Sequence, residues 1–193
     1  RKSGPHSGPY YYSHETSRMS NSQPIVLGLD VGTQSLRAAL VDLNGKTLAF
    51  GVEPIETTYP RPAWAEQQPR DWWKAAKSAT RKALAASGID PSRVVAIGLD
   101  CTACTVVACG NDGEPLRPSL LWMDQRAHVE ATEISATGDP VLKYVSGRVS
   151  PEWMLPKALW LKRNEPETYD RAERLVECTD WMMHRLTGEW TLS

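Results

Sequence analysis

An acid, a glycine and two hydroxyl residues stand together where the first apolar run of the chain ends. Asp30 lies near the end of this run, and the turn after it contains Gly32, Thr33, Gln34 and Ser35. Because glycine adopts backbone angles that other residues avoid, successive N–H groups around Thr33 and Gln34 can point at one anion, assisted by the hydroxyls. Asp30 is suited to a hydrated divalent cation, since hard cations prefer carboxylate and water oxygens. The turn is predicted to be a phosphate cradle, and an ordinary hairpin turn is the alternative.

A second polar loop follows the apolar run of residues 94–99 and reads Asp100-Cys101-Thr102-Ala103-Cys104. Ligands of open sheets bind beyond the carboxyl ends of strands, so Asp100, Thr102 and the backbone of Ala103 are predicted to contact a substrate. The alternative is a strand end whose polar groups satisfy only their own turn. The Cys-x-x-Cys spacing also matches redox motifs, but a second cysteine pair or a histidine partner is missing, which makes this the minor hypothesis.

The third candidate stretch, Trp122-Met123-Asp124-Gln125-Arg126, joins an aromatic ring to an acid and a base. Sugars suit such a group, because their C–H faces lie against an aromatic ring while hydroxyls bridge a carboxylate and a guanidinium. Trp122, Asp124 and Arg126 are therefore predicted to bind a sugar. The alternative is a core tryptophan followed by a helix cap and an exposed ion pair.

Composition indicates a soluble globular protein with small-molecule partners. The chain has 193 residues, of which 41% are apolar, enough for one good core. Its formal charge of −1 lacks the basic excess that is typical of surfaces for nucleic acid or membranes. The longest apolar run, residues 94–99, is far shorter than the roughly 18 residues of a membrane span. Four cysteines are too few for a disulfide scaffold, which favours a reducing compartment and a cytoplasmic location.

Residues 1–23 differ in composition from the rest of the chain, being rich in Ser, Gly, Tyr and basic residues. We predict that they form a disordered tail or a leader outside the core. A basic, acid-poor segment is typical of a transit-peptide remnant, which would mean a plastid or another organelle. Translated leader sequence ahead of Met19 and an expression scar are the other interpretations.

The pattern after residue 23 predicts an α/β domain whose mixed sheet begins with three antiparallel strands. A hairpin is expected over 25–42 and a third strand over 47–52, after the Asn44-Gly45 turn. Residues 53–69 carry four prolines and predict an irregular crossing. A helix over 71–87 should pack on the sheet and stop at Gly88.

The later part of the chain alternates short apolar runs with helices. Residues 94–100 are apolar on both faces and predict a central strand, with a further strand over 105–108 and a buried run over 120–123. Helices are expected at 124–137, with Asp124 as a possible N-cap, and at 156–163, 166–172 and 179–186.

Five stretches, in this order and at this spacing, resemble the amino-terminal domain of the FGGY carbohydrate kinases from Ile25 to the end of the chain. They are residues 28–35, Trp64-Ala65-Glu66-Gln67 with Trp72-Trp73, residues 96–99, residues 121–126, and Thr179-Asp180-Trp181 with Leu186-Thr187-Gly188. The resemblance implies a ribonuclease-H-like fold shared with hexokinase and actin. It implies an enzyme that uses ATP and Mg²⁺ to phosphorylate a sugar.

The resemblance also implies roles for the candidate residues. Asp30 would organise Mg²⁺, and the turn of Gly32, Thr33, Gln34 and Ser35 would hold the ATP phosphates. The sugar would be held by Asp100, Thr102, Ala103, Trp122, Asp124 and Arg126. In family members the aspartate that acts as general base lies farther along, as does the lobe that binds adenosine. Both are expected beyond Ser193, so residues 24–193 would be an incomplete amino-terminal domain, inactive by itself.

The loop of residues 100–105 is similar to that of ribulose and ribitol kinases. It departs from the Gln-Met-His-Gly loop of xylulokinases and from the Asn-Gln-Arg-Glu loop of glycerol kinases. A ketopentose or pentitol of ribo type is therefore the expected substrate. Two alternatives stay open: a non-catalytic sugar- or nucleotide-binding module of the same fold, and an ATP-dependent enzyme with another acceptor. The sequence does not predict the oligomeric state.

Overall fold

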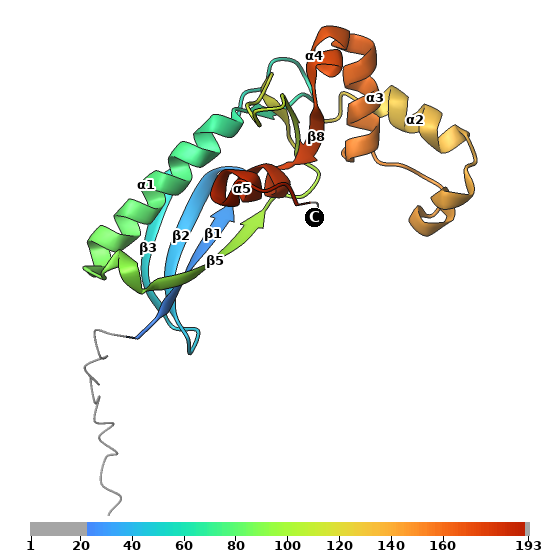
Figure 1. The fold of residues 1–193 in the computed structure, drawn as a ribbon. Helices are drawn as coiled ribbons and strands as arrows, with labels where there is room; N and C mark the ends of the chain where they lie inside the picture. The colour runs from blue at the N-terminus through green and yellow to red at the C-terminus, as the bar shows by residue number, and fades with distance from the viewer. Residues whose placement is uncertain (1–22, 192–193) are drawn as a thin grey trace, which may run out of the picture.

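The first sheet carries the candidate phosphate turn. The computed structural model describes residues 23–191, so the predicted tail or leader lies outside the described residues apart from Gln23. The strand order is β3-β2-β1-β5, with bounds β1 Ile25–Val31, β2 Ser35–Asp42, β3 Thr47–Pro54 and β5 Val94–Cys101 (Figure 1). β1, β2 and β3 are antiparallel neighbours, as predicted, and β5 runs parallel to β1.

Two helices cover one face of this sheet. α1, Pro69–Ser87, crosses β3 and β2, and α5, Cys178–Thr187, contacts β5 (Figure 1). Alternate β1 side chains point into this layer, which gives the strand its strict buried and half-buried alternation. α1 approaches closely because its inner face is mostly alanine, and a Cβ on Gly51 of β3 would lie 1.8 Å from the Ala79 carbonyl oxygen. The predicted stop is confirmed, since Gly88 is left-handed with φ 65°.

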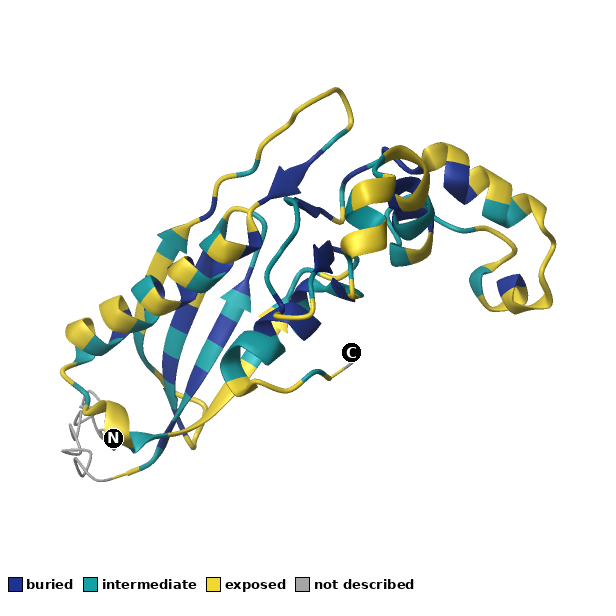
Figure 2. Ribbon diagram, turned by 45° about the horizontal axis from the view of Figure 1, so that its top comes forward, coloured by how far each residue is buried: buried dark blue, intermediate teal, exposed yellow. Residues whose placement is uncertain are grey.

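The prediction that residues 94–100 form a central strand is wrong for the described residues. β5 lies at the edge of the sheet, next to β1 alone. Val95 and Ile97 are 63% and 49% exposed, and β5 is largely exposed in Figure 2. An apolar run indicates that its side chains tend to be buried. It does not indicate whether the strand has one neighbour or two in the sheet.

A second sheet, of order β4-β7-β6-β8, contains the shorter strands. Their bounds are β4 Glu66–Gln67, β6 Val106–Cys109, β7 Ser119–Leu120 and β8 Arg174–Glu177. The predicted strand over 105–108 is β6, but it belongs to this separate sheet rather than to the first one. The crossing of residues 53–69 is mostly irregular, as predicted, yet it contributes β4 through the backbone of Glu66 and Gln67.

Four further helices lie beyond the second sheet, namely α2 His128–Ala136, η2 Pro140–Val145, α3 Met154–Asn164 and α4 Pro166–Arg171 (Figure 1). The short η1, Pro91–Arg93, instead joins α1 to β5 in the first sheet. The prediction of a helix capped by Asp124 is wrong: α2 begins four residues later, with Ala127 as N-cap and no side-chain capping bond. Asp124 instead binds the backbone N–H of Ala65, 2.6 Å away, so its carboxylate ties two loops together.

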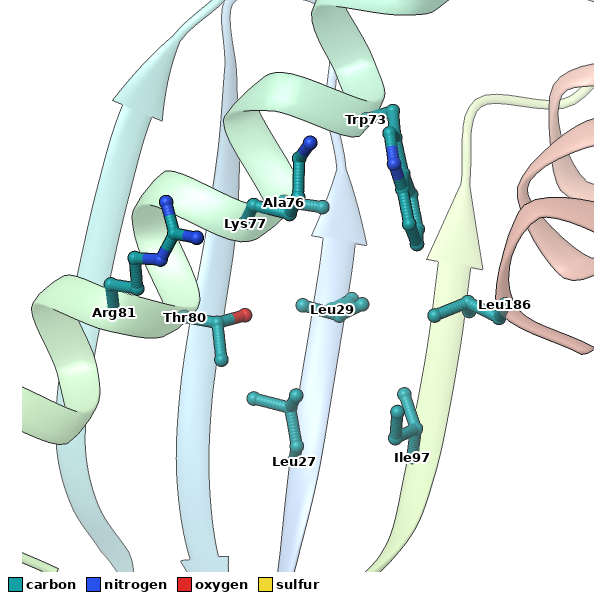
Figure 3. A pocket seen from close by; sticks show the side chains of 9 residues that line it. All are labelled: Leu27, Leu29, Trp73, Ala76, Lys77, Thr80, Arg81, Ile97 and Leu186. Carbon is teal, nitrogen blue, oxygen red and sulfur yellow. The ribbon is translucent and has the colours of Figure 1, made fainter. Parts of the chain in front are cut away.

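An apolar cavity of about 280 Å³ lies between α1, β1, β5 and α5. Figure 3 displays its lining, with Leu27 and Leu29 from β1, Ile97 from β5, Trp73 from α1 and Leu186 from α5. Lys77 and Arg81 of α1 also line it, but carboxylates do not. It therefore lacks the carboxylate ligands that hard cations prefer.

Candidate active site

A cavity of about 460 Å³ gathers five of the eleven predicted site residues, and four separate segments form its walls. The β1–β2 turn, the loop after β5, the loop after β7 and the segment before α3 form its walls. Its lining consists of Gly32, Thr33, Thr102, Ala103, Cys104, Trp122 and Glu152. The structure thus joins the turn, the polar loop and the tryptophan that the sequence analysis predicted separately, and it adds Glu152.

The β1–β2 turn presents backbone donors that the protein itself does not use. The Gly32 N–H donates to the Ser35 carbonyl at 3.1 Å and closes the turn. Across the described part of the chain, no hydrogen bond uses the N–H of Thr33 or Gln34. The Thr33 carbonyl, by contrast, accepts from Nε2 of Gln67 at 2.6 Å. Free N–H groups in a fixed turn are the feature that an anion site requires.

The expected reason for glycine at position 32 is wrong. Gly32 is absent from the glycines with positive φ, so the turn does not need its freedom to be left-handed. A Cβ at this position would instead lie 3.2 Å from the Ser35 carbonyl oxygen. The small residue is explained by the tight closure of the turn around that oxygen.

The loop after β5 is held in place from three sides. The Thr102 N–H donates to the Val31 carbonyl at 3.3 Å, and the Thr102 and Thr105 hydroxyls share a hydrogen bond of 3.0 Å. Cys104 is left-handed, with φ 58°, a conformation that is uncommon for a residue with a side chain. Its N–H donates to the Glu177 carboxylate at 2.9 Å, and its carbonyl accepts from Lys157 at 2.8 Å.

Lys157 of α3 is fully buried behind this cavity. Its Nζ also donates to the Leu121 carbonyl at 2.7 Å, so one ammonium group fixes the loop after β5 and the residue before Trp122. Burial lowers the pKa of Lys157 to about 8, although nearby acids, Asp124 first, oppose that shift. Lys157 was not predicted as a site residue, because a lysine within a helical pattern is normally exposed.

The cysteines of the polar loop do not support redox chemistry. Cys101 and Cys104 are both free thiols. Burial, followed by the nearby Glu177 carboxylate, raises the pKa of Cys104. A raised pKa lowers the thiolate fraction, and the thiolate is the reactive species.

Asp124 and Arg126 do not line the cavity. Both side chains are fully buried, and Arg126 Nη2 lies 2.7 Å from Asp124 Oδ2 and 2.8 Å from Glu66 Oε1. The Arg126 guanidinium also lies over the Trp64 ring, 3.8 Å from its centroid. These residues therefore support the loop that carries Trp122. The Trp64-Ala65-Glu66-Gln67 stretch was the available signal for this network, but no role was predicted for Glu66 or Gln67.

Asp30 and Asp100 lie together at a second cavity, of about 420 Å³, on the open face of the first sheet. They are partners in the parallel β1–β5 register, so their side chains leave the sheet on one face. Arg37 pairs with Asp30 at 2.6 Å, with both side chains about half exposed. Mg²⁺ is commonly bound by one or two carboxylates and several waters, and these accessible carboxylates fit that donor set. Among residues 23–191, no group of three or more His, Cys, Asp or Glu could hold a metal.

The sequence of this domain matches a known protein family. The N-terminal domain of the FGGY family of carbohydrate kinases matches residues 25–193. This chain belongs to the FGGY family. Its fold is accordingly the actin- and hexokinase-like ATPase fold of those sugar kinases, with three antiparallel strands and flanking helices.

Similar proteins include kinases for different pentuloses. The chain is 35% identical to a ribulokinase of Anoxybacillus flavithermus, covering 85% of this chain and 34% of that protein. It is 34% identical to a D-ribulokinase of Saccharomyces cerevisiae, covering 92% and 27%. The crystal structure of a xylulose kinase from Rhodospirillum rubrum matches with a TM-score of 0.79 and 29% identity, covering 86% and 35%. The chain thus spans about a third of the length of the curated relatives it matches, or less.

Within the described residues, no helix is long and apolar enough to cross a membrane.

Proposed function

We propose that the protein carrying this domain transfers a phosphoryl group from ATP to a sugar hydroxyl. The observation that carries the proposal is the single cavity in which the β1–β2 turn, the loop of residues 102–104 and Trp122 meet. Phosphoryl transfer requires positioning and charge neutralisation more than covalent chemistry by the protein. A turn with free N–H groups beside an aromatic wall is suited to hold the two reactants next to each other.

Each part of the site has a role in this proposal. ATP with Mg²⁺ would supply the transferable phosphoryl group and neutralise its charge. The free N–H groups of Thr33 and Gln34 would hold phosphate oxygens, with Gly32 and Ser35 closing the turn. Asp30, with Asp100 beside it, would bind the hydrated Mg²⁺. Asp100 is thus proposed to lie at the metal, whereas the sequence predicted it to contact the sugar.

The sugar would lie against the ring of Trp122, which is 40% exposed, with its hydroxyls toward Thr102 and the backbone of Ala103. Asp124 and Arg126 would act behind this wall by fixing the Trp122 loop, because both are fully buried and bonded to each other. We infer a ketopentose or pentitol of ribo type as the substrate. The loop of residues 100–105 and the similar proteins named ribulokinase support this choice.

Activity is proposed to need more chain than residues 1–193. We predicted no general-base aspartate within this chain. That aspartate and the adenosine-binding lobe are both expected beyond Ser193. Turnover of a sugar by the purified 193-residue chain would contradict this part of the proposal.

The test is an ATP-coupled assay of the protein at its full natural length against pentuloses, pentitols, glycerol and hexoses. The proposal expects ADP release that depends on Mg²⁺ and is fastest with ribulose or ribitol. A titration of ribulose followed by tryptophan fluorescence, with wild type and Trp122→Ala, tests the sugar wall. An unchanged binding curve in the variant would show that Trp122 does not contact the sugar. In the ATP-coupled assay, ADP release that does not depend on any acceptor would contradict the proposed sugar kinase activity.

A further inference from the structure

One hydrogen bond connects the aromatic wall of the cavity with the candidate phosphate turn. The indole N–H of Trp122 donates to the Thr33 hydroxyl, with 3.0 Å between Nε1 and Oγ1. Trp122 comes from the loop after β7 and Thr33 from the β1–β2 turn, and both line the same cavity. The contact therefore joins the proposed sugar wall to the proposed phosphate cradle.

The chemistry of the two groups fixes the direction of this bond. An indole N–H can only donate, so the Thr33 oxygen must be the acceptor. A threonine hydroxyl has one proton to donate and two lone pairs. Within the described residues, the hydroxyl of Thr33 has no other hydrogen-bond partner. Its proton is therefore directed away from the indole and stays available for a ligand in the cavity.

Both ends of the bond are anchored independently of it. The backbone of Thr33 is held by Gln67, which is 3% exposed and whose Oε1 accepts from the Trp72 indole at 2.8 Å. The N–H of Trp122 donates to Thr105 Oγ1 at 3.2 Å, and the carbonyl of Leu121 is held by Lys157. Since these anchors fix the two backbones, the indole bond mainly determines how the Thr33 hydroxyl points.

We propose that Trp122 is a positioning residue for Thr33 as well as a wall for the sugar. By occupying one lone pair of the Thr33 oxygen, the indole leaves the O–H to donate to an anionic oxygen of the phosphoryl donor. The ring face and the ring N–H thus serve the two reactants separately. This inference rests on the proposed function and adds to it a contact through which the acceptor wall orders the phosphate turn.

The experiment is a double-mutant cycle of Thr33→Val and Trp122→Phe in the full-length protein. Thr33→Val removes the hydroxyl at nearly constant volume, and Trp122→Phe keeps an aromatic face but removes the N–H. Each single variant should lower kcat/KM for ATP about 5- to 10-fold, the size expected for one hydrogen bond in the transition state. The kcat/KM of the double variant for ATP should be no lower than that of the less active single variant, because both changes remove the same contact. Trp122→Phe should leave KM for the sugar within about twofold, whereas Trp122→Ala should raise it.

Trp73→Phe is the matched control, because Trp73 lies at the apolar cavity of Figure 3 and away from the proposed site. Single effects that multiply in the double variant would overturn the proposal, as would a Trp122→Phe effect confined to KM for the sugar. Calorimetric titration with a non-hydrolysable ATP analogue and Mg²⁺ provides a readout without turnover. If the wild type phosphorylates no tested acceptor, the proposed function fails, and equal nucleotide affinity of wild type and Trp122→Phe then rejects this inference separately.

Discussion

Lys157 should give the stability of this protein an unusual dependence on pH. Its ammonium group is fully buried and donates to the carbonyls of Cys104 and Leu121. Burial lowers its pKa from 10.5 to about 8 in the folded protein. The unfolded chain therefore binds more protons at this position than the folded chain between about pH 8 and 10.5. Stability should rise with pH across that window, since stability increases wherever the unfolded state holds the extra proton.

The magnitude follows from the size of the shift. Lowering the pKa by about 2.5 units corresponds to about 3 kcal/mol of destabilisation when Lys157 is fully protonated, at 1.36 kcal/mol per unit. This cost is present below about pH 8 and is largely removed near pH 10.5. Between pH 7 and pH 9.5 the wild type should therefore gain about 2 kcal/mol of unfolding free energy from this one group.

The assay is equilibrium urea unfolding at several pH values, comparing wild type with Lys157→Met. Other cysteines, tyrosines and lysines titrate in both proteins, so the difference between the two curves isolates Lys157. Lys162→Met, at an exposed position of the same helix, is the control and should follow the wild type at every pH. A wild-type to Lys157→Met difference that stays constant from pH 7 to pH 9.5 would refute the assignment of a buried, pKa-shifted lysine.

Three further changes test other parts of the structure. Gly51→Ala should destabilise the domain by about 1–3 kcal/mol, because its Cβ would collide with the Ala79 carbonyl of α1; thermal unfolding measures this, and Gly98→Ala, in a strand with open space around the added Cβ and no positive φ, is the control. Arg126→Met should cost about 3–5 kcal/mol, since it leaves the buried Asp124 carboxylate without its ion-pair partner and removes one of the two arginines paired with Glu66; a loss below 1 kcal/mol in urea unfolding would contradict the buried network. Asp30→Asn should raise the Mg²⁺ concentration needed for half-maximal activity of the full-length enzyme at least about tenfold, and an unchanged Mg²⁺ dependence would remove Asp30 from the metal site.

Much of the local structure was predictable because it depends on near neighbours. The Asn44-Gly45 turn, the alternation along β1 and the left-handed stop at Gly88 all follow from residue type and spacing. The edge position of β5 and the division into two sheets were not predictable. Strand pairing is decided between segments that are far apart in the chain, and an apolar run carries no information about its partners.

The site divides in the same way. The sequence indicated the turn around Thr33, the Thr102 loop and Trp122, and the structure brings these into one cavity. Asp124 and Arg126, by contrast, lie behind the Trp122 loop and do not line the cavity. A charged pair next to an aromatic residue in the sequence can either face a ligand or be buried as a support. The burial of both side chains in the structure decides for the second case.

The sequence by itself determined which residue types are available for phosphate, metal and sugar, and it determined the family through five stretches in order. The tertiary structure decided how those residues are grouped. It put Asp30 beside Asp100, linked Trp122 to Thr33, and buried Lys157 where two loops meet. The physical reason is that chemical capacity belongs to a side chain, whereas burial, hydrogen-bond partners and pKa arise from segments that meet only in the folded chain.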